Sequence, residues 1–185
     1  MITPPNEILT AIESADSFLV ASHYNPDGDA IGSMAAMGFL LQALGKSYTL
    51  YNHSGLPERY AWLEIPQAIT THVPDRKHEW AFLLDCGDLD RAGDALTSSI
   101  SREKIINIDH HLGNPGFGGY NWVDPECPAV GEMVASLARH FEIPLSKGLG
   151  RAIYLALVTD TGSFSYSNTK PETLELAAEI IRNGL

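Results

Sequence analysis

Four short segments of the chain are dominated by apolar residues, many of them β-branched or aromatic, and each segment is followed by polar residues. Segments of this length and composition are typical of buried β-strands. Three are nearly continuous apolar runs, whereas the segment at 47–52 alternates between polar and apolar positions. We therefore expect strands at 18–22, 47–52, 80–84 and 105–108.

Longer segments with apolar residues at helical spacing lie between and after these strands. The segment at 30–44 is strongly apolar and ends at Gly45, which predicts a buried crossover helix. Shorter helical segments are expected after Pro4 and Pro5, at 57–62 and at 90–96. Three further helices are predicted at 129–141, 149–158 and 171–181, the last with Thr169 as its N-cap. This alternation predicts an α/β fold: a three-layer domain with a mostly parallel sheet flanked by helices, and a helical C-terminal third.

Acidic residues and histidines directly follow three of the predicted strands. The carboxyl ends of parallel strands meet at one edge of a sheet, and open sheets bind ligands at that edge. A further acid, Asp160, follows the apolar stretch at 153–158 after a single threonine, and it is either a helix cap or another ligand. The candidate metal ligands gathered at this edge are His23, Asp27, Asp29, Asp85, His110 and Asp160.

The composition of this set favours a pair of hard divalent cations. Any one of these residues alone would more often be a turn former or a surface group, so their joint occurrence carries the argument. Carboxylates favour Mg²⁺ or Mn²⁺ and imidazoles add affinity for transition metals, so Mn²⁺ is the expected ion and Mg²⁺ the alternative. Six ligands suit two ions about 3.5–4 Å apart that share one carboxylate, as in sites that cleave phosphoesters. Asp85, which follows a central strand, is the predicted bridge.

Charge and cysteine content narrow the class of protein. Twelve basic and 23 acidic residues give a formal net charge of −11, which argues against a basic face for long nucleic acid. Cys86 and Cys127 form neither a disulfide framework nor a Cys-x-x-Cys metal site. No apolar run is long enough to span a bilayer. We expect a soluble, cytoplasmic protein whose anionic substrate is short.

Four motifs, taken in their order along the chain, carry a resemblance to a known family. They are His23-x-Asn25-Pro26-Asp27-Gly28-Asp29, Asp85-x-Gly87-Asp88-x-x-Arg91, Asp109-His110-His111 and Thr159-Asp160-Thr161-Gly162. Their order and spacing resemble those of the DHH phosphoesterases over residues 18–185. Within that family the chain is most similar to the branch of nanoRNases, oligoribonucleases and pAp phosphatases, which is related to RecJ-type exonucleases.

The resemblance implies a role for each matched residue. One Mn²⁺ would be held by His23, Asp27 and Asp85, and the other by Asp29, Asp85, His110 and Asp160. Asp109 would support the ligands without binding metal, and His111 would face the substrate phosphate as a hydrogen-bond donor or general acid. Arg91 would pair with a substrate oxyanion. The implied reaction is attack on phosphorus by a water that two metal ions activate.

The family also implies substrates, partners and a domain organisation. The expected substrates are short RNA oligonucleotides or 3′-phosphoadenosine 5′-phosphate (pAp). A long duplex and a membrane are not expected as partners, and a homodimer is left open. Relatives carry a second, substrate-binding domain, DHHA1, which nothing in 1–185 resembles, so we expect this chain to be the catalytic domain alone. A non-catalytic nucleotide- or metal-binding domain and a pyrophosphatase-like hydrolase are the alternatives.

Overall fold

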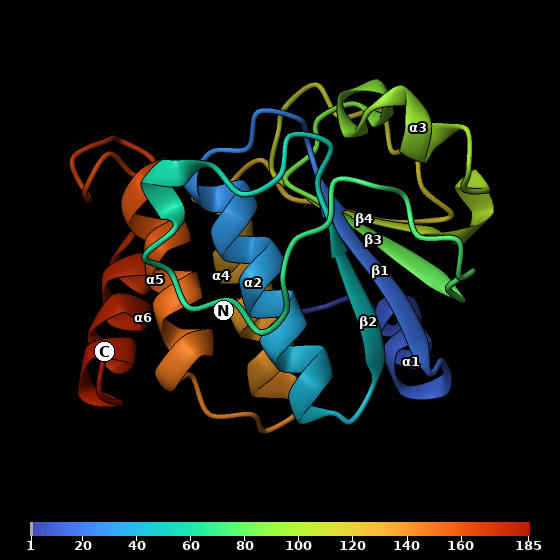
Figure 1. Ribbon diagram of the computed structural model, residues 1–185. Helices are drawn as coiled ribbons and strands as arrows, with labels where there is room; N and C mark the ends of the chain where they lie inside the picture. The colour runs from blue at the N-terminus through green and yellow to red at the C-terminus, as the bar shows by residue number, and fades with distance from the viewer. Residues whose placement is uncertain (1) are drawn as a thin grey trace.

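The computed structural model describes residues 2–185, which contain a five-stranded parallel sheet in the order β2-β1-β3-β4-β5 (Figure 1). The strands are β1 Ser17–Ser22, β2 Ser47–Tyr51, β3 Trp80–Leu84, β4 Ile105–Asp109 and β5 Tyr120–Val123. Each of the four predicted strands is confirmed to within one residue at either end. Because β1, β3 and β4 are parallel neighbours, their carboxyl ends lie side by side at one edge.

The fifth strand is missed by the sequence analysis. β5 has four residues, lies at the edge of the sheet and follows a glycine-rich loop. Only Trp122 among its side chains is buried, so β5 has too short an alternation of buried and exposed positions to predict a strand. Its pairing with β4, which places Trp122 opposite Ile108, is a tertiary contact that the local sequence does not show.

Six α-helices and three short 3₁₀ turns are described within residues 2–185. They are α1 Asn6–Ser14, α2 Gly28–Ala43, η1 Glu58–Tyr60, η2 Leu89–Ala92, α3 Asp94–Thr97, η3 Arg102–Lys104, α4 Val130–His140, α5 Lys147–Asp160 and α6 Pro171–Arg182. The α/β class and the helical C-terminal third are confirmed. α5 is two residues longer at each end than predicted, so Asp160 is its last residue.

The predicted N-cap of α6 is wrong. Lys170 holds the N-cap position, and its side chain makes no capping hydrogen bond. Pro171 begins the helix, and a proline forces the residue before it into an extended conformation, which is the backbone geometry of an N-cap. The proline therefore places the start of the helix one residue later than a threonine cap would.

Two apolar layers cover the two faces of the sheet, because side chains alternate along each strand. On β1, Phe18 and Val20 belong to the larger layer, which contains residues of α1, α2, α4, α5 and α6. Leu19 and Ala21 belong to the smaller layer with η2 and α3. Figure 1 shows α2, α4, α5 and α6 gathered on one side of the strands, with α3 away from them. This arrangement agrees with the predicted three layers.

Close contacts between helices bring their ends to the carboxyl edge of the sheet. A Cβ on Gly28, the first residue of α2, would lie 2.3 Å from a side-chain atom of Thr159 near the end of α5. A Cβ on Gly131, in the first turn of α4, would lie 2.4 Å from the Cβ of Ala156. Glycine at these two positions therefore lets the starts of α2 and α4 approach the end of α5.

The two cysteines are core residues. Cys86 and Cys127 are both buried and free, so they form no disulfide with each other. Each thiol donates to a backbone carbonyl two residues further along the chain. Separately, none of the helices found in residues 2–185 combines the length and the apolar character that crossing a membrane requires.

Candidate metal centre

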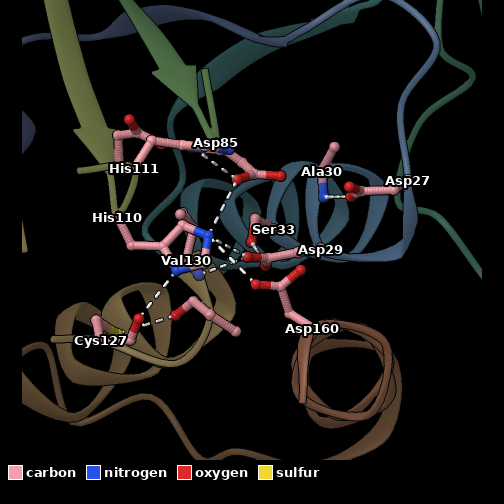
Figure 2. A network of polar contacts seen from close by, with 12 residues as sticks. Asp27, Asp29, Ala30, Ser33, Asp85, His110, His111, Cys127, Val130 and Asp160 are labelled. Atoms are coloured by element: carbon pink, nitrogen blue, oxygen red, sulfur yellow. Dashed lines mark hydrogen bonds and ion pairs between the residues drawn. The ribbon is translucent and has the colours of Figure 1, made fainter. Parts of the chain in front are cut away.

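The predicted ligands converge at the carboxyl edge of the sheet. His23 follows β1, Asp85 follows β3 and His110 follows β4. Asp29 lies in the first turn of α2, and Asp160 ends α5. Figure 2 shows the side chains of Asp29, Asp85, His110 and Asp160 pointing toward one another. Residues more than 130 positions apart thus meet at the predicted place.

The first group of candidate ligands consists of His23, Asp27 and Asp85, each with one ligand atom within 4.8 Å of the others. His23 Nε2 lies 3.9 Å from Asp27 Oδ2 and 3.7 Å from Asp85 Oδ2. His23 Nδ1 lies 2.7 Å from the carbonyl of Tyr24, which can only accept, so Nδ1 donates and Nε2 faces the carboxylates. Asp27 Oδ1 accepts from the N–H of Ala30 as the N-cap of α2, which leaves Oδ2 directed at the group.

The second group consists of Asp29, His110 and Asp160, again with ligand atoms within 4.8 Å of one another. His110 Nε2 lies 3.9 Å from Asp29 Oδ2 and 3.3 Å from Asp160 Oδ2. His110 Nδ1 donates to the carbonyl of Cys127 at 2.9 Å, which orients this ring as the Tyr24 carbonyl orients His23. Both histidines therefore present Nε2 to carboxylates, as metal-binding histidines do.

Asp85 lies between the two groups. Its Oδ2 is 3.7 Å from His23 Nε2, and its Oδ1 is 3.5 Å from His110 Nε2. Its N–H donates to the carbonyl of Ile108, which extends the pairing of β3 with β4 by one residue. Its φ of +52° lies in the left-handed region, which a residue other than glycine seldom adopts and which is frequent at functional sites. One carboxylate oxygen therefore faces each group, which is the arrangement that a shared ligand requires.

Asp29 also has partners that the sequence did not reveal. Its Oδ2 accepts from the N–H of Val130 at 2.6 Å, and its Oδ1 accepts from the N–H of Gly131 at 3.0 Å. The hydroxyl of Ser33 donates to Oδ1 at 2.8 Å. These two N–H groups open α4, and its N-cap residue, Ala129, makes no side-chain capping bond. Asp29 thus holds the start of α4 while its carboxylate faces His110.

Burial and mutual repulsion disturb the protonation of this cluster. Burial, reinforced by the charge of Asp29, raises the pKa of Asp85 to about 7. Burial also raises the pKa of Asp29, and it raises the pKa of Asp160 to about 6. Burial would lower the pKa of His110, but Asp85 and Asp29 outweigh it and raise that pKa to about 10. Converging buried carboxylates therefore favour added positive charge, and this oxygen and imidazole donor set fits divalent cations.

Asp109 and His111 form a hydrogen-bonded pair beside these ligands. His111 Nδ1 lies 2.8 Å from Asp109 Oδ1 and 3.7 Å from Asp85 Oδ1. The Asp109 side chain is fully buried, whereas that of His111 is 40% exposed. Burial would raise the pKa of Asp109, but hydrogen bonds from His111 and Asn114 lower it. The hydrogen bond to Asp109 in turn raises the pKa of His111, which favours the protonated imidazole with Nε2–H available as a donor.

His111 also lies within reach of the ligand cluster itself. One atom each of Asp85, His110 and His111 fall within 4.8 Å of one another. The hydrogen bond to Asp109 already uses Nδ1, the nitrogen nearest to Asp85. The ring is therefore better placed to donate from Nε2 than to coordinate through Nδ1.

Arg91 lies close to the cluster but is not tied to it. It belongs to η2, is half-buried, and accepts a hydrogen bond from the N–H of Tyr24 with its carbonyl. That backbone contact holds Arg91 beside Tyr24, the residue that follows His23. Burial lowers the pKa of His23, and the charge of Arg91 lowers it further. Its side chain makes no ion pair with any carboxylate of the described residues. A cation near the cluster without a protein partner is placed to meet an anion.

The chain is similar in sequence to known proteins. Residues 17–158 match the N-terminal domain of the DHH family. The chain is 32% identical to the bifunctional oligoribonuclease and PAP phosphatase NrnA of Thermus thermophilus, over 97% of this chain and 53% of that protein. It is 27% identical to the protein of the same name from Bacillus subtilis, over 95% of this chain and 56% of that protein. The chain therefore spans about half the length of the curated relatives it matches.

A solved structure supports the same fold. The crystal structure of an exopolyphosphatase-related protein from Bacteroides fragilis superposes with a TM-score of 0.86 at 27% identity. The match covers 97% of this chain and 56% of that protein. The α/β arrangement described above is therefore shared with a protein of similar sequence.

Proposed function

This chain belongs to the DHH family, and from that premise we propose that it is a metal-dependent phosphoesterase that cleaves short oligoribonucleotides and pAp. The observation that carries the proposal is the meeting of two three-residue ligand groups at Asp85. The Asp109–His111 pair stands directly beside them. Two bound metal ions with a proton donor beside them are the groups that catalyse phosphoester hydrolysis in such sites.

We assign the cations to residues as the two groups suggest. His23, Asp27 and Asp85 would hold one divalent ion, and Asp29, Asp85, His110 and Asp160 would hold the other. Bound there, the ions would supply Lewis acidity toward the phosphoester and activate water for the attack. The mixture of carboxylates and imidazoles favours Mn²⁺ over Mg²⁺.

The remaining roles belong to the chain's own side chains. His111 donates from Nε2 to the departing oxygen, while Asp109 holds Nδ1 and so fixes the orientation of the ring. Arg91 pairs with a phosphate oxygen through its guanidinium. The burial of Asp109 excludes water from the back of the ring, so that only the exposed side of His111 meets substrate.

The substrate class follows from the relatives and from the charge of the chain. Two relatives are named as bifunctional oligoribonucleases and PAP phosphatases, and we extend that pair of activities to this protein. A formal charge of −11 opposes binding of long polyanions, which favours short substrates. We take residues 1–185 to form the catalytic domain, and the two free cysteines support a cytoplasmic site of action.

The test is hydrolysis by the purified chain with and without Mn²⁺, on a ribodinucleotide, on pAp and on pyrophosphate. We expect Mn²⁺-dependent release of mononucleotide from the dinucleotide and of phosphate from pAp, and loss of both in Asp85→Ala. Asp16→Ala is the control, because its side chain is 96% exposed and lies outside the centre. Cleavage of pyrophosphate alone would favour the pyrophosphatase-like alternative, and metal binding without any hydrolysis would favour a binding domain.

A further inference from the structure

Asn114 lies three residues after His111, in the loop that follows β4, and it contacts the buried acid of the Asp109–His111 pair. Its Nδ2 donates to Asp109 Oδ2 at 2.6 Å. His111 Nδ1 donates to the other oxygen, Oδ1, at 2.8 Å. The two oxygens of one buried carboxylate are therefore divided between the imidazole and the amide, so the plane of the carboxylate is set by Asn114.

The amide of Asn114 is itself held in one orientation. Its Oδ1 accepts from Asn107 Nδ2 at 3.0 Å and from the N–H of Gly116 at 2.8 Å. Its Nδ2 also donates to the carbonyl of Cys86 at 3.3 Å. Donors surround the oxygen and acceptors surround the nitrogen, so a flipped amide would lose every one of these bonds. Cys86 directly follows Asp85, and Asn114 thereby ties the loop after β4 to the loop that carries the central ligand.

The backbone of this loop is fixed as well. The N–H of Asn114 donates to the carbonyl of His111 at 3.1 Å, which closes a turn between them. Pro115 follows and restricts the backbone of Asn114 to an extended conformation. Asn107 is fully buried, and it donates both to Asn114 and, at 3.3 Å, to Asn121 Oδ1. The side chain of Asn114 thus rests on β4, through Asn107 and Asp109, and on the backbone of Cys86 after β3.

We propose that Asn114 is a positioning residue of the reaction, which acts through Asp109 to hold the His111 ring with Nε2 toward the leaving oxygen of the substrate. The inference rests on the proposed function. In the step it serves, the oxygen of an incoming water bonds to phosphorus and releases a proton to solvent, while the bond from phosphorus to the leaving oxygen breaks and a proton passes from Nε2 to that oxygen. His111 then regains a proton from solvent. Without Asn114, the Asp109 carboxylate can rotate, and the ring of His111, which is 40% exposed, loses its fixed direction.

The distinguishing measurement compares two leaving groups. A ribose alkoxide is a poor leaving group and needs a proton, whereas p-nitrophenolate is a good leaving group and departs without one. We expect Asn114→Ala to lower kcat on a ribodinucleotide by about 10- to 100-fold, part of what a general acid contributes, with little change in KM. Its kcat on a p-nitrophenyl phosphodiester should fall by less than about threefold, because that reaction does not require the proton. Equal losses on both substrates would overturn the proposal.

A matched control and a double variant separate positioning from a structural role. Asn121→Ala removes a residue that bonds Asn107 but does not touch Asp109, and it should leave kcat on both substrates unchanged. In a His111→Ala background, Asn114→Ala should cause no further loss on the dinucleotide, since its effect passes through that ring. Additive losses, or losses that follow Mn²⁺ affinity or melting temperature, would show that Asn114 acts on the fold.

A spectroscopic measurement keeps this inference separate from the proposed function. In a ¹⁵N-histidine sample, the His111 Nδ1 proton bound to Asp109 should give a downfield signal that disappears in Asn114→Ala and persists in Asn121→Ala. If the wild-type chain hydrolyses neither substrate, the proposed function fails, and with it the catalytic role of Asn114. If the chain is active and the signal survives in Asn114→Ala, the proposed function stands and the positioning role falls.

Discussion

At Asp85, both the backbone conformation and the side chain serve the candidate metal centre. A left-handed φ of +52° costs conformational energy for a residue other than glycine. In this conformation one carboxylate oxygen of Asp85 faces each ligand group. Asp27, in contrast, faces only the first group and is 53% exposed. The binding of both metal ions should therefore require Asp85, whereas the binding of only one should require Asp27.

We predict that Asp85→Ala abolishes binding of both Mn²⁺ ions, whereas Asp27→Ala weakens one ion and largely spares the other. The reason is that only Asp85 has an oxygen toward each histidine. Calorimetric titration of the metal-free protein, checked by elemental analysis of the loaded protein, measures the number of ions. A single bound ion in the wild-type chain, or two in Asp85→Ala, would contradict the prediction.

The protonation of these residues makes metal binding depend on pH. In the folded, metal-free protein the pKa values of Asp85 and Asp160 are raised to about 7 and about 6. As pH rises, these carboxyls therefore stay protonated in the folded chain at pH values where they are already ionised in the unfolded chain. A raised pKa stabilises the fold below the unfolded value, and that stabilisation is lost as pH rises through the folded value. The metal-free protein should therefore lose stability between about pH 4 and pH 7.

We predict that Mn²⁺ affinity rises steadily from pH 5 to pH 8, with protons released on binding. The ions must displace protons from Asp85 and Asp160, and from His110, whose pKa is raised to about 10. Titrations in two buffers that differ in ionisation enthalpy count the released protons. Binding enthalpies that are equal in both buffers at pH 6.5 would show that no protons are released, so that the carboxylates are already ionised and His110 is already neutral.

At the scale of elements, Asp29 links α2 to α4 as well as facing the centre. It accepts from the N–H groups of Val130 and Gly131 and from the hydroxyl of Ser33. Because α4 has no side-chain cap of its own, these bonds satisfy backbone donors that would otherwise be buried without a partner. A candidate metal ligand therefore also stabilises the packing of two helices.

We predict that Asp29→Ala lowers the free energy of unfolding of the metal-free protein by about 1–3 kcal/mol, because two backbone donors lose their acceptor. Ser33→Ala is the matched comparison, since it removes one donor to the same carboxylate and should cost about 1 kcal/mol. Urea unfolding in the presence of a chelator measures both. An unchanged or raised midpoint for Asp29→Ala would mean that relief of repulsion in the cluster outweighs the lost bonds.

Some elements and contacts of the fold could be predicted from the sequence, and others could not. Asp85 and His110 could be found because each directly follows a predicted strand or its last acid, and parallel strands bring such ends together. β5 could not, because its identity as a strand depends on pairing with β4. The bond from Val130 to Asp29 spans 101 residues, and that from Asn114 to Asp109 depends on the exact rotamers of a loop, so neither leaves a periodic signal. The resemblance to the DHH family supplied the division of ligands into two groups.

For the whole molecule, the concentration of carboxylates at one edge of the sheet is a source of instability that bound cations would relieve. Three carboxylates of the centre, Asp29, Asp85 and Asp160, have raised pKa values, with burial as the main cause. We predict that Mn²⁺ raises the melting temperature in proportion to the logarithm of its concentration above the dissociation constant, and that Mg²⁺ raises it less. Thermal scans with each ion and with a chelator test this. Equal shifts from both ions would argue against imidazole ligands.

The last prediction concerns how the chain holds its substrate. The chain spans about half the length of the curated relatives, so we propose that the other half of such proteins helps to orient the nucleotide. The ligand cluster and His111 lie entirely within this chain, whereas orientation of a substrate supplies a large part of catalytic rate.

We therefore expect kcat/KM on a p-nitrophenyl phosphodiester to be within about tenfold of that of the Thermus thermophilus relative. On a ribodinucleotide we expect it to be at least about 100-fold lower than that of the relative, mainly through KM. Equal dinucleotide turnover by the two proteins would show that these 185 residues already form the whole substrate site.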